Sequence, residues 1–101
     1  MLAEFSVTPI GAGVSVGKHV AECLRIIERS GLDYKINPMG TVVEGDFDEV
    51  MSLIAKCHKA VRKRCQRVST IIKIDDRRGV RDAIHSKVAS VEREVGHRLK
   101  T

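Results

Sequence analysis

The spacing of apolar residues switches between two periods along this chain, and this switching limits the possible folds more than any other feature. Residues 2–8 alternate apolar and polar positions and place Ala3, Phe5 and Val7 on one side, which is the pattern of a half-buried strand. Residues 16–27 carry apolar side chains at every third or fourth position, which predicts an amphipathic helix. The same change from strand spacing to helix spacing occurs again further along the chain.

Turn and capping residues mark the ends of the elements in the first half. Ser15 is the expected N-cap of the first helix, and Gly31 supplies the stop at its C-terminal end. Short strands are expected at residues 34–36 and 41–44, on either side of a turn that begins at Asn37-Pro38.

The second half begins with another helix. Asp46 and Glu49 have the spacing of a capping box, and the helix that follows is expected to extend to about Cys65. Residues 68–75 alternate again and predict a fourth strand. The apolar stripe of the second helix consists of Phe47, Val50, Leu53, Ile54, Cys57 and Val61.

The resulting order is β-α-β-β-α-β with one further helix, which is the split βαβ pattern of ferredoxin-like folds. Right-handed crossovers place the first two helices on the same side of the sheet. The sequence therefore predicts an α+β, ferredoxin-like βαββαβ sandwich, with a four-stranded antiparallel sheet, two helices on one face and a C-terminal helix. We expect residues 1–101 to form a single domain of this type.

One face of such a sheet has no helix over it. Period-two alternation turns Phe5, Val7, Val43, Ile72 and Ile74 toward the helices. The uncovered face is then either a solvated surface or an interface with another subunit, because its side chains are both polar and apolar. These side chains are Glu4, Ser6, Thr8, Val42, Glu44, Ser69, Ile71, Lys73 and Asp75.

The last helix favours association over folding back onto its own sheet. Its apolar residues lie at positions 80, 84, 88, 91, 95 and 99, close to the spacing of a coiled-coil seam. The sheet and the first two helices already form a closed core, so this helix is not required to complete it. We expect Ile84, Val88, Val91 and Val95 to lie in an oligomer interface.

Composition narrows the function classes. The 18 Lys and Arg against 13 Asp and Glu give a net charge of +5, which leaves open a basic interaction module that binds nucleic acid or a protein partner. Nucleic acid is the less favoured partner, because the chain offers few aromatic residues for stacking on bases. No apolar run is long enough for a membrane span, so no membrane partner is expected. The odd number of cysteines, 3, favours free thiols in a cytoplasmic protein.

Four stretches together resemble a known family. They are AEFSVTPIG, YKINPMGTVVEGDFDEV, TIIKIDDRRG and KVASVERE, and they occur in this order over nearly the whole chain. They are similar to the thiamine-binding protein family, a small YkoF-like family long treated as conserved but uncharacterised. The resemblance implies a ferredoxin-like sandwich, a homotetramer built as a dimer of dimers, and binding of thiamine or its hydroxymethylpyrimidine part. It implies no catalytic activity and no cofactor apart from thiamine as a bound ligand.

The chemistry of such a ligand suggests which residues bind it. Thiamine has a cationic thiazolium ring, which a carboxylate such as Glu44 or Asp75 can meet, and an aminopyrimidine that hydroxyl groups of Ser6 and Thr41 can bond. A flat cation can stack on Tyr34, and Met39 offers a soft apolar wall. Purely structural roles remain open for each of these residues, for example Tyr34 as a filler on an edge strand and Thr41 as a turn residue.

Four charges follow the last strand, at Asp75-Asp76-Arg77-Arg78. Arginine can grip a carboxylate through two parallel hydrogen bonds, so these residues can pair between subunits. We expect Asp76 and Arg78 in the oligomer interface together with Lys73, and we expect Asp75 and Arg77 in the interface or the ligand site. A solvated strand end is the alternative.

Other motifs carry little chemistry. The glycines near residue 13 do not fit the dinucleotide-binding fingerprint, and no phosphate-loop lysine follows them. Cys57 and the adjacent His58 point about 100° apart on a helix, so they are poorly placed to share a metal ion. No cysteine–histidine or serine–histidine pair is spaced so as to suggest an activated nucleophile, which is why we expect no enzyme, no catalytic residue and no metal site.

Overall fold

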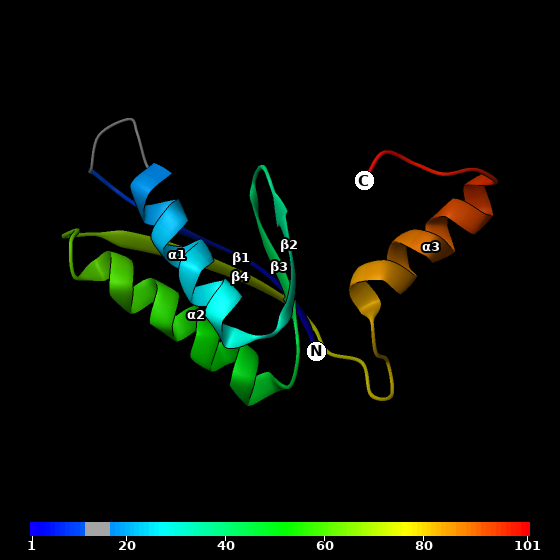
Figure 1. The fold of residues 1–101 in the computed structure, drawn as a ribbon, viewed down its shortest axis with the longest axis horizontal. Coiled ribbons are helices and arrows are strands. Elements are labelled where there is room, and N and C mark those ends of the chain that lie inside the picture. Colours follow the sequence, from blue (N-terminus) through cyan, green and yellow to red (C-terminus); the bar gives the residue numbers. More distant parts are fainter. Residues whose placement is uncertain (12–16) are drawn as a thin grey trace.

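The computed structural model describes residues 1–11 and 17–101. Within them, three helices and four strands follow one another along the chain (Figure 1). The expected Ser15 N-cap and Val16 lie outside the described residues. The elements are β1 (Leu2–Pro9), α1 (Gly17–Ser30), β2 (Asp33–Asn37), β3 (Gly40–Glu44), α2 (Phe47–Arg62), β4 (Val68–Asp75) and α3 (Ala83–Val95).

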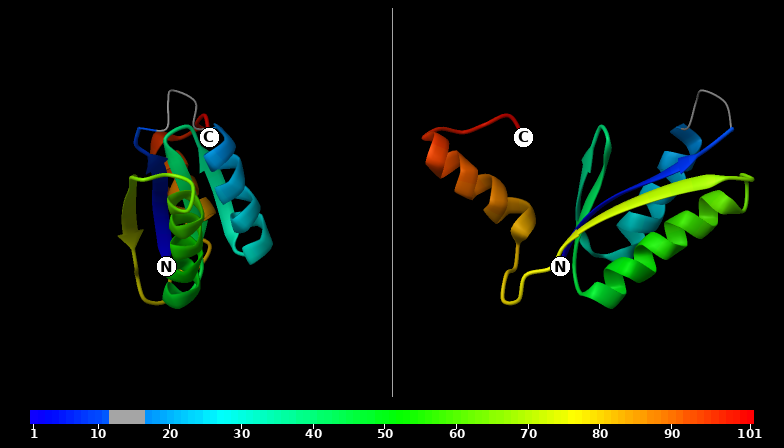
Figure 2. Two further views of the ribbon diagram at one scale, coloured as in Figure 1. Left: turned by 90° about the vertical axis from the view of Figure 1, so that its left-hand side faces the viewer. Right: turned by 180° about the vertical axis from the view of Figure 1, so that it is seen from behind.

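The four strands form one antiparallel sheet in the order β2-β3-β1-β4. Helices α1 and α2 pack side by side on the same face of this sheet (Figures 1 and 2). The expected α+β, ferredoxin-like sandwich is therefore confirmed. The strand order places β1 in the interior of the sheet and leaves β2 and β4 at its edges.

The core lies between the sheet and these two helices. The sheet contributes Ala3 and Phe5 from β1 and Val43 from β3. Val43 lies opposite Ala3, and Phe5 follows Ala3 by two residues, so all three point to the same face. Burial of apolar surface of this kind is the main favourable contribution to folding. The helices contribute Cys23, Ile27, Val50, Leu53, Ile54, Cys57 and Val61.

Most of the expected element boundaries agree with the structure within one or two residues. Gly31 has a φ of 75°, which a C-terminal glycine stop of α1 requires. Helix α2 ends at Arg62 rather than near Cys65. Just past this end, the Arg62 guanidinium donates to the carbonyl of Cys65 at 3.1 Å.

The predicted capping box of α2 is wrong. Asp46 is the N-cap residue, but its side chain makes no capping hydrogen bond. The backbone just before this helix is instead tied to the start of the chain. The N-terminal amine of Met1 donates to the Gly45 carbonyl at 2.8 Å, and the Gly45 N–H donates to the Met1 carbonyl at 3.1 Å.

Three apolar residues that were expected to face the core are more exposed than their spacing suggests. Ile72 and Ile74 lie opposite Phe5 and Ala3 and so share the helix-covered face, yet they are 37% and 42% exposed. They belong to β4, an edge strand, where the helices cover less of the sheet. Phe47 is 53% exposed, because it is the first residue of α2 and lies at the end of the sandwich.

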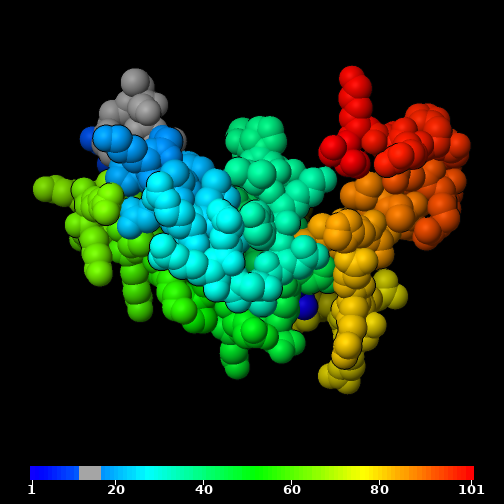
Figure 3. All heavy atoms as spheres, in the orientation of Figure 1, coloured from blue at the N-terminus to red at the C-terminus, as the bar shows by residue number. Residues whose placement is uncertain are grey.

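Helix α3 stands beyond the end of the sandwich and does not lie across the uncovered face of the sheet (Figures 1 and 2). In the space-filling view it forms, with the residues after it, a lobe at one end of the molecule (Figure 3). Its first turn is anchored, since Ala83 and Ile84 are buried. Further along, Val91 and Val95 are 53% and 48% exposed.

Within residues 1–11 and 17–101, no helix has the length and apolarity that crossing a lipid bilayer requires.

The placement of the core predicts the cost of cavities in it. Ile54→Ala removes a side chain that is 2% exposed and should lower the free energy of unfolding by about 2–5 kcal/mol. Ile10→Ala makes the same chemical change at a position that is 41% exposed and should cost less than about 1 kcal/mol. Urea denaturation of both variants tests this, and equal losses would contradict the core described above.

Candidate functional site

A pocket lies where the two long strands extend past the short hairpin. All eight residues of β1 pair with β4, but only Leu2 to Phe5 pair with β3. The segment from Ser6 to Pro9 therefore has no strand on its β3 side. The tip of the β2–β3 hairpin, helix α1 and this open edge enclose a cavity of about 440 Å³, which we call the hairpin pocket.

The walls of the hairpin pocket come from four parts of the fold. Strand β1 provides one side, α1 the floor, the hairpin tip the opposite side, and β4 adds Ile71. The lining residues are Phe5, Ser6, Val7, Thr8, Val20, Cys23, Leu24, Ile27, Ile36, Asn37, Pro38, Met39, Gly40, Thr41 and Ile71.

The hairpin tip is brought close to β1 by its sequence. Asn37 pairs with Gly40, so Pro38 and Met39 form a two-residue turn, and proline suits the first of these positions. A Cβ atom on Gly40 would lie 3.2 Å from the carbonyl oxygen of Phe5, so glycine permits the close approach of the hairpin to β1. Met39 at the tip is 91% exposed.

The chemistry of the hairpin pocket is that of an uncharged, mostly apolar site. None of the described residues that line it carries a charge. Its polar side chains are the hydroxyl groups of Ser6, Thr8 and Thr41, the amide of Asn37 and the thiol of Cys23. Such a pocket can hold a flat apolar ring and offer its heteroatoms a few hydrogen bonds.

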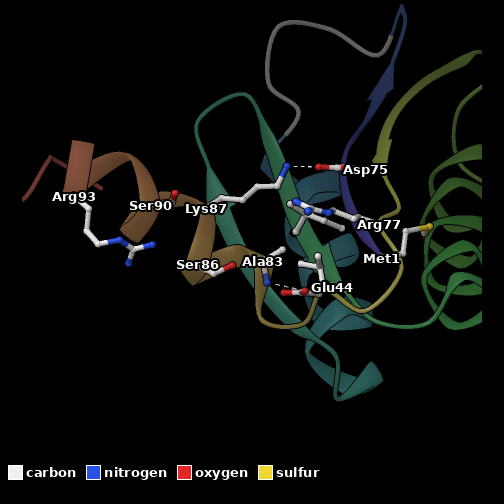
Figure 4. Close-up of a pocket in the computed structure, with 11 residues that line it drawn as sticks. Met1, Glu44, Asp75, Arg77, Ala83, Ser86, Lys87, Ser90 and Arg93 are labelled. Carbon is white, nitrogen blue, oxygen red and sulfur yellow. Dashed lines mark hydrogen bonds and ion pairs between the residues drawn. The ribbon is translucent and has the colours of Figure 1, made fainter. Parts of the chain in front are cut away.

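A second, more polar pocket of about 350 Å³ lies between α3 and the end of the sheet, and we call it the α3 pocket (Figure 4). Glu44, at the end of β3, uses both carboxylate oxygens there. The N–H groups of Ala83 and Ile84 donate to them at 2.7 and 3.1 Å. A carboxylate at the first turn of a helix satisfies free N–H groups and complements the helix dipole. Glu44 is therefore the anchor of α3.

Asp75 also connects the sheet to α3. Its carboxylate pairs with the ammonium group of Lys87, and the two side chains meet across the α3 pocket (Figure 4). The hydrogen bond and charge of Lys87 lower the pKa of Asp75, with a smaller contribution from Arg77. Both groups are exposed, so the pair adds little to stability. The pair therefore links β4 to α3 without contributing much to the free energy of unfolding.

The structure divides the six predicted ligand-binding residues into two groups. Ser6, Met39 and Thr41 meet in the hairpin pocket, whereas Glu44 and Asp75 lie in the α3 pocket. Tyr34 lines neither pocket; it lies opposite Val43 at the edge of the sheet and is 37% exposed.

The residues that were expected at a subunit interface are exposed to different degrees. Ile84 is buried within its own chain and Val88 is half-buried. Arg77 lines the α3 pocket. The exposed members are Lys73, Asp76, Arg77, Arg78, Val91 and Val95.

Two groupings of side chains could not be seen in the sequence. Asp33, Asp82 and His85 bring one ligand atom each to within 4.8 Å of one another at the start of α3. Cys65 Sγ lies 3.7 Å from His19 Nε2, although 46 residues separate them. Both groupings join residues that are adjacent only in the folded chain, so spacing along the sequence could not reveal them.

The fold and the hairpin pocket define a ferredoxin-like domain with space for a small molecule. The family model described as thiamine-binding protein matches residues 3–92. A UPF0045 protein from Mycobacterium bovis is 48% identical over 94 residues, which are 92% of this chain and 92% of the relative. The chain therefore belongs to the thiamine-binding protein family.

Solved structures agree with this assignment. The crystal structure of a Methanocaldococcus jannaschii protein named as hypothetical is 34% identical, with a TM-score of 0.83, and the match covers 89% of this chain and 93% of that one. A Thermotoga maritima protein, named for thiamine biosynthesis or salvage, has a TM-score of 0.76 at 21% identity and is matched over 89% of this chain and 96% of its own. The second likeness supports the fold alone.

The anchoring role of Glu44 predicts a local effect of mutation. Glu44→Gln removes the negative charge that accepts two N–H groups of α3, and such bonds contribute about 1.5–3 kcal/mol. Hydrogen exchange of the α3 amides should quicken by about tenfold or more, with the amides of β1 unchanged. Glu4→Gln, at an exposed position of β1, is the matched control. Unchanged exchange in α3 would contradict the anchor.

The start of α3 also predicts a titration. The hydrogen bond and charge of Asp82, 2.6 Å away, raise the pKa of His85, with smaller contributions from Asp33 and Glu44. Because the folded pKa is raised, the stabilisation is present below the ordinary value of about 6.5 and is lost as pH rises through the folded value. An NMR titration of the His85 imidazole should therefore have a midpoint that falls on Asp82→Asn. The same midpoint in both proteins would contradict the pairing.

Proposed function

We propose that this protein is a non-catalytic homo-oligomer that binds thiamine, or the hydroxymethylpyrimidine part of thiamine, in the hairpin pocket. The observation that carries the proposal is the pocket itself. It is a largely apolar cavity with hydroxyl and amide groups, in a chain that belongs to the thiamine-binding protein family.

The aminopyrimidine ring suits this pocket better than the thiazolium ring does. It is flat and uncharged, and it carries both hydrogen-bond donors and acceptors. Ser6, Thr41 and Asn37 can act as donors and acceptors toward it, and Phe5 and Ile36 supply apolar walls.

The cationic thiazolium ring belongs at the mouth of the pocket. Removing a charge from water is costly unless an opposite charge meets it, and the described lining offers no carboxylate. In this arrangement the pyrimidine provides most of the binding energy, and the cation stays in contact with water or with a neighbouring subunit.

The exposed apolar residues support the proposed assembly. Ile71 on the uncovered face of the sheet is 67% exposed, and Val91 and Val95 on α3 are 53% and 48% exposed. A tetramer built from two dimers needs two different subunit interfaces. Exposed apolar surface at two separate places, on the sheet and on α3, can supply one interface each.

The proposed role is binding, in line with the family description. The described residues around the hairpin pocket include no histidine, carboxylate or lysine, and the thiol of Cys23 is the titratable group among them. The three cysteines are free thiols in the structure, which supports a reducing location such as the cytoplasm.

Binding measurements test the pocket. Thr41→Val should weaken the binding of hydroxymethylpyrimidine and of thiamine by about 2- to 10-fold, because one hydrogen bond contributes about 0.5–1.5 kcal/mol. Ser69→Ala removes a hydroxyl group at an exposed position of β4 outside the hairpin pocket and should leave both affinities unchanged. Calorimetry provides the measurement. No heat with either compound, from a protein of confirmed fold, would overturn the proposed function.

Sedimentation tests the assembly. Val91→Asp and Val95→Asp place charges on the exposed side of α3, where a subunit contact would have to bury them. The wild-type protein should sediment as an oligomer at micromolar concentration, and the double variant as a smaller species. A wild-type protein that sediments as a monomer would contradict the proposed oligomer, but it would not contradict ligand binding in the hairpin pocket.

A further inference from the structure

Two cysteines face each other in the packing of α1 against α2. Cys57 Sγ lies 3.7 Å from the backbone oxygen of Cys23, and Cys23 Sγ lies 3.9 Å from the backbone oxygen of Cys57. These reciprocal contacts mean that each sulfur reaches the backbone of the other residue. A bond between the sulfurs requires each side chain to turn from the backbone oxygen of the other residue toward its sulfur.

The two residues differ in their access to the hairpin pocket. Cys23 lines the hairpin pocket and is 9% exposed, whereas Cys57 is 0% exposed. The third cysteine, Cys65, lies apart from the pair and contacts His19. A small reagent that enters the hairpin pocket therefore meets Cys23 first.

The two thiols also differ in acidity. A hydrogen bond from Cys57 lowers the pKa of Cys23, against an opposing effect of burial. The same hydrogen bond raises the pKa of Cys57, and burial raises it further. Thiolate is the nucleophilic form of cysteine, so this direction agrees with the position of Cys23 in the lining of the hairpin pocket.

We propose that Cys23 and Cys57 form an oxidisable pair, in which Cys23 at the floor of the hairpin pocket reacts with small hydroperoxides and Cys57 resolves the product into a disulfide. Cys23 thiolate attacks one peroxide oxygen, the O–O bond breaks, and the other oxygen leaves as hydroxide or alkoxide and takes up a proton. Cys23 is now a sulfenic acid. The Cys57 thiol then loses its proton, its sulfur bonds to Cys23 sulfur, and the sulfenic oxygen leaves as water. The thiols lose two electrons, and the peroxide gains them.

The disulfide would tether α1 to α2 through the wall of the hairpin pocket. Because Cys23 lines this pocket, a molecule bound there covers the thiol and should slow its oxidation. That protection rests on the proposed function, whereas formation of the disulfide does not.

Intact mass and peptide mapping of the folded protein test the pair. The background is Cys65→Ser, which removes the third thiol. Treatment with hydrogen peroxide should remove the mass of two hydrogen atoms and give a cross-linked peptide that contains Cys23 and Cys57. Cys57→Ser in the same background should stop at the sulfenic acid, which a cyclic dione captures at Cys23. Cys23→Ser should remain unmodified at Cys57.

Two results would overturn the proposal. One is a folded Cys65→Ser protein that keeps both thiols under peroxide while the urea-unfolded protein oxidises. The other is oxidation of Cys57 in the folded Cys23→Ser variant. Hydroxymethylpyrimidine at saturating concentration should slow the oxidation of Cys23 at least about fivefold. Loss of this protection alone, with the disulfide still formed, counts against the ligand site and leaves the thiol pair in place.

Discussion

The pairing of β1 on both of its edges is the constraint on which the rest of the structure depends. Ala3 and Phe5, in the half of β1 that pairs with both neighbours, face the helices and form the sheet side of the core. The other half, from Ser6 onward, pairs only with β4 because β3 is shorter. The same strand thus provides the core at one end and the open edge of the hairpin pocket at the other.

Strand β3 separates two functions in a similar way. Its first residues, Gly40 and Thr41, close the hairpin pocket, whereas its last residue, Glu44, holds the first turn of α3. The proposed ligand site and the attachment of α3 therefore lie at opposite ends of one five-residue strand. A helix held mainly at its first turn leaves its apolar side free for another subunit, which is the assembly proposed above.

The periodicity of the sequence predicts the fold well because it reports which side of each element is buried. The alternation in residues 2–8 and the stripe through Val50 and Val61 both correspond to buried surfaces. The predicted capping box does not form, and the chain just before α2 is held instead by Met1 at Gly45, a contact between residues 44 positions apart. Sequence spacing carries no information about such a contact.

The candidate site could be predicted only in part, for the same reason. Ser6, Met39 and Thr41 follow from the hairpin turn and the strand before it, and the structure brings them together. Glu44 was a reasonable partner for a cation by its chemistry, but its carboxylate is occupied by α3. The contact between Cys23 and Cys57 depends on how α1 packs against α2. Apolar spacing in the sequence indicates that the two helices pack on the sheet, but it does not show which residues of one helix meet which residues of the other.

The most direct measurement of the central claim is an NMR titration of the protein with hydroxymethylpyrimidine and with thiamine, observed through backbone amides. The account predicts that the largest chemical-shift changes for both compounds cluster at Ser6, Ile36 and Thr41. Changes centred instead on Glu44, Asp75 and Lys87, with the amides of the hairpin tip unmoved, would place the ligand in the α3 pocket and contradict the account.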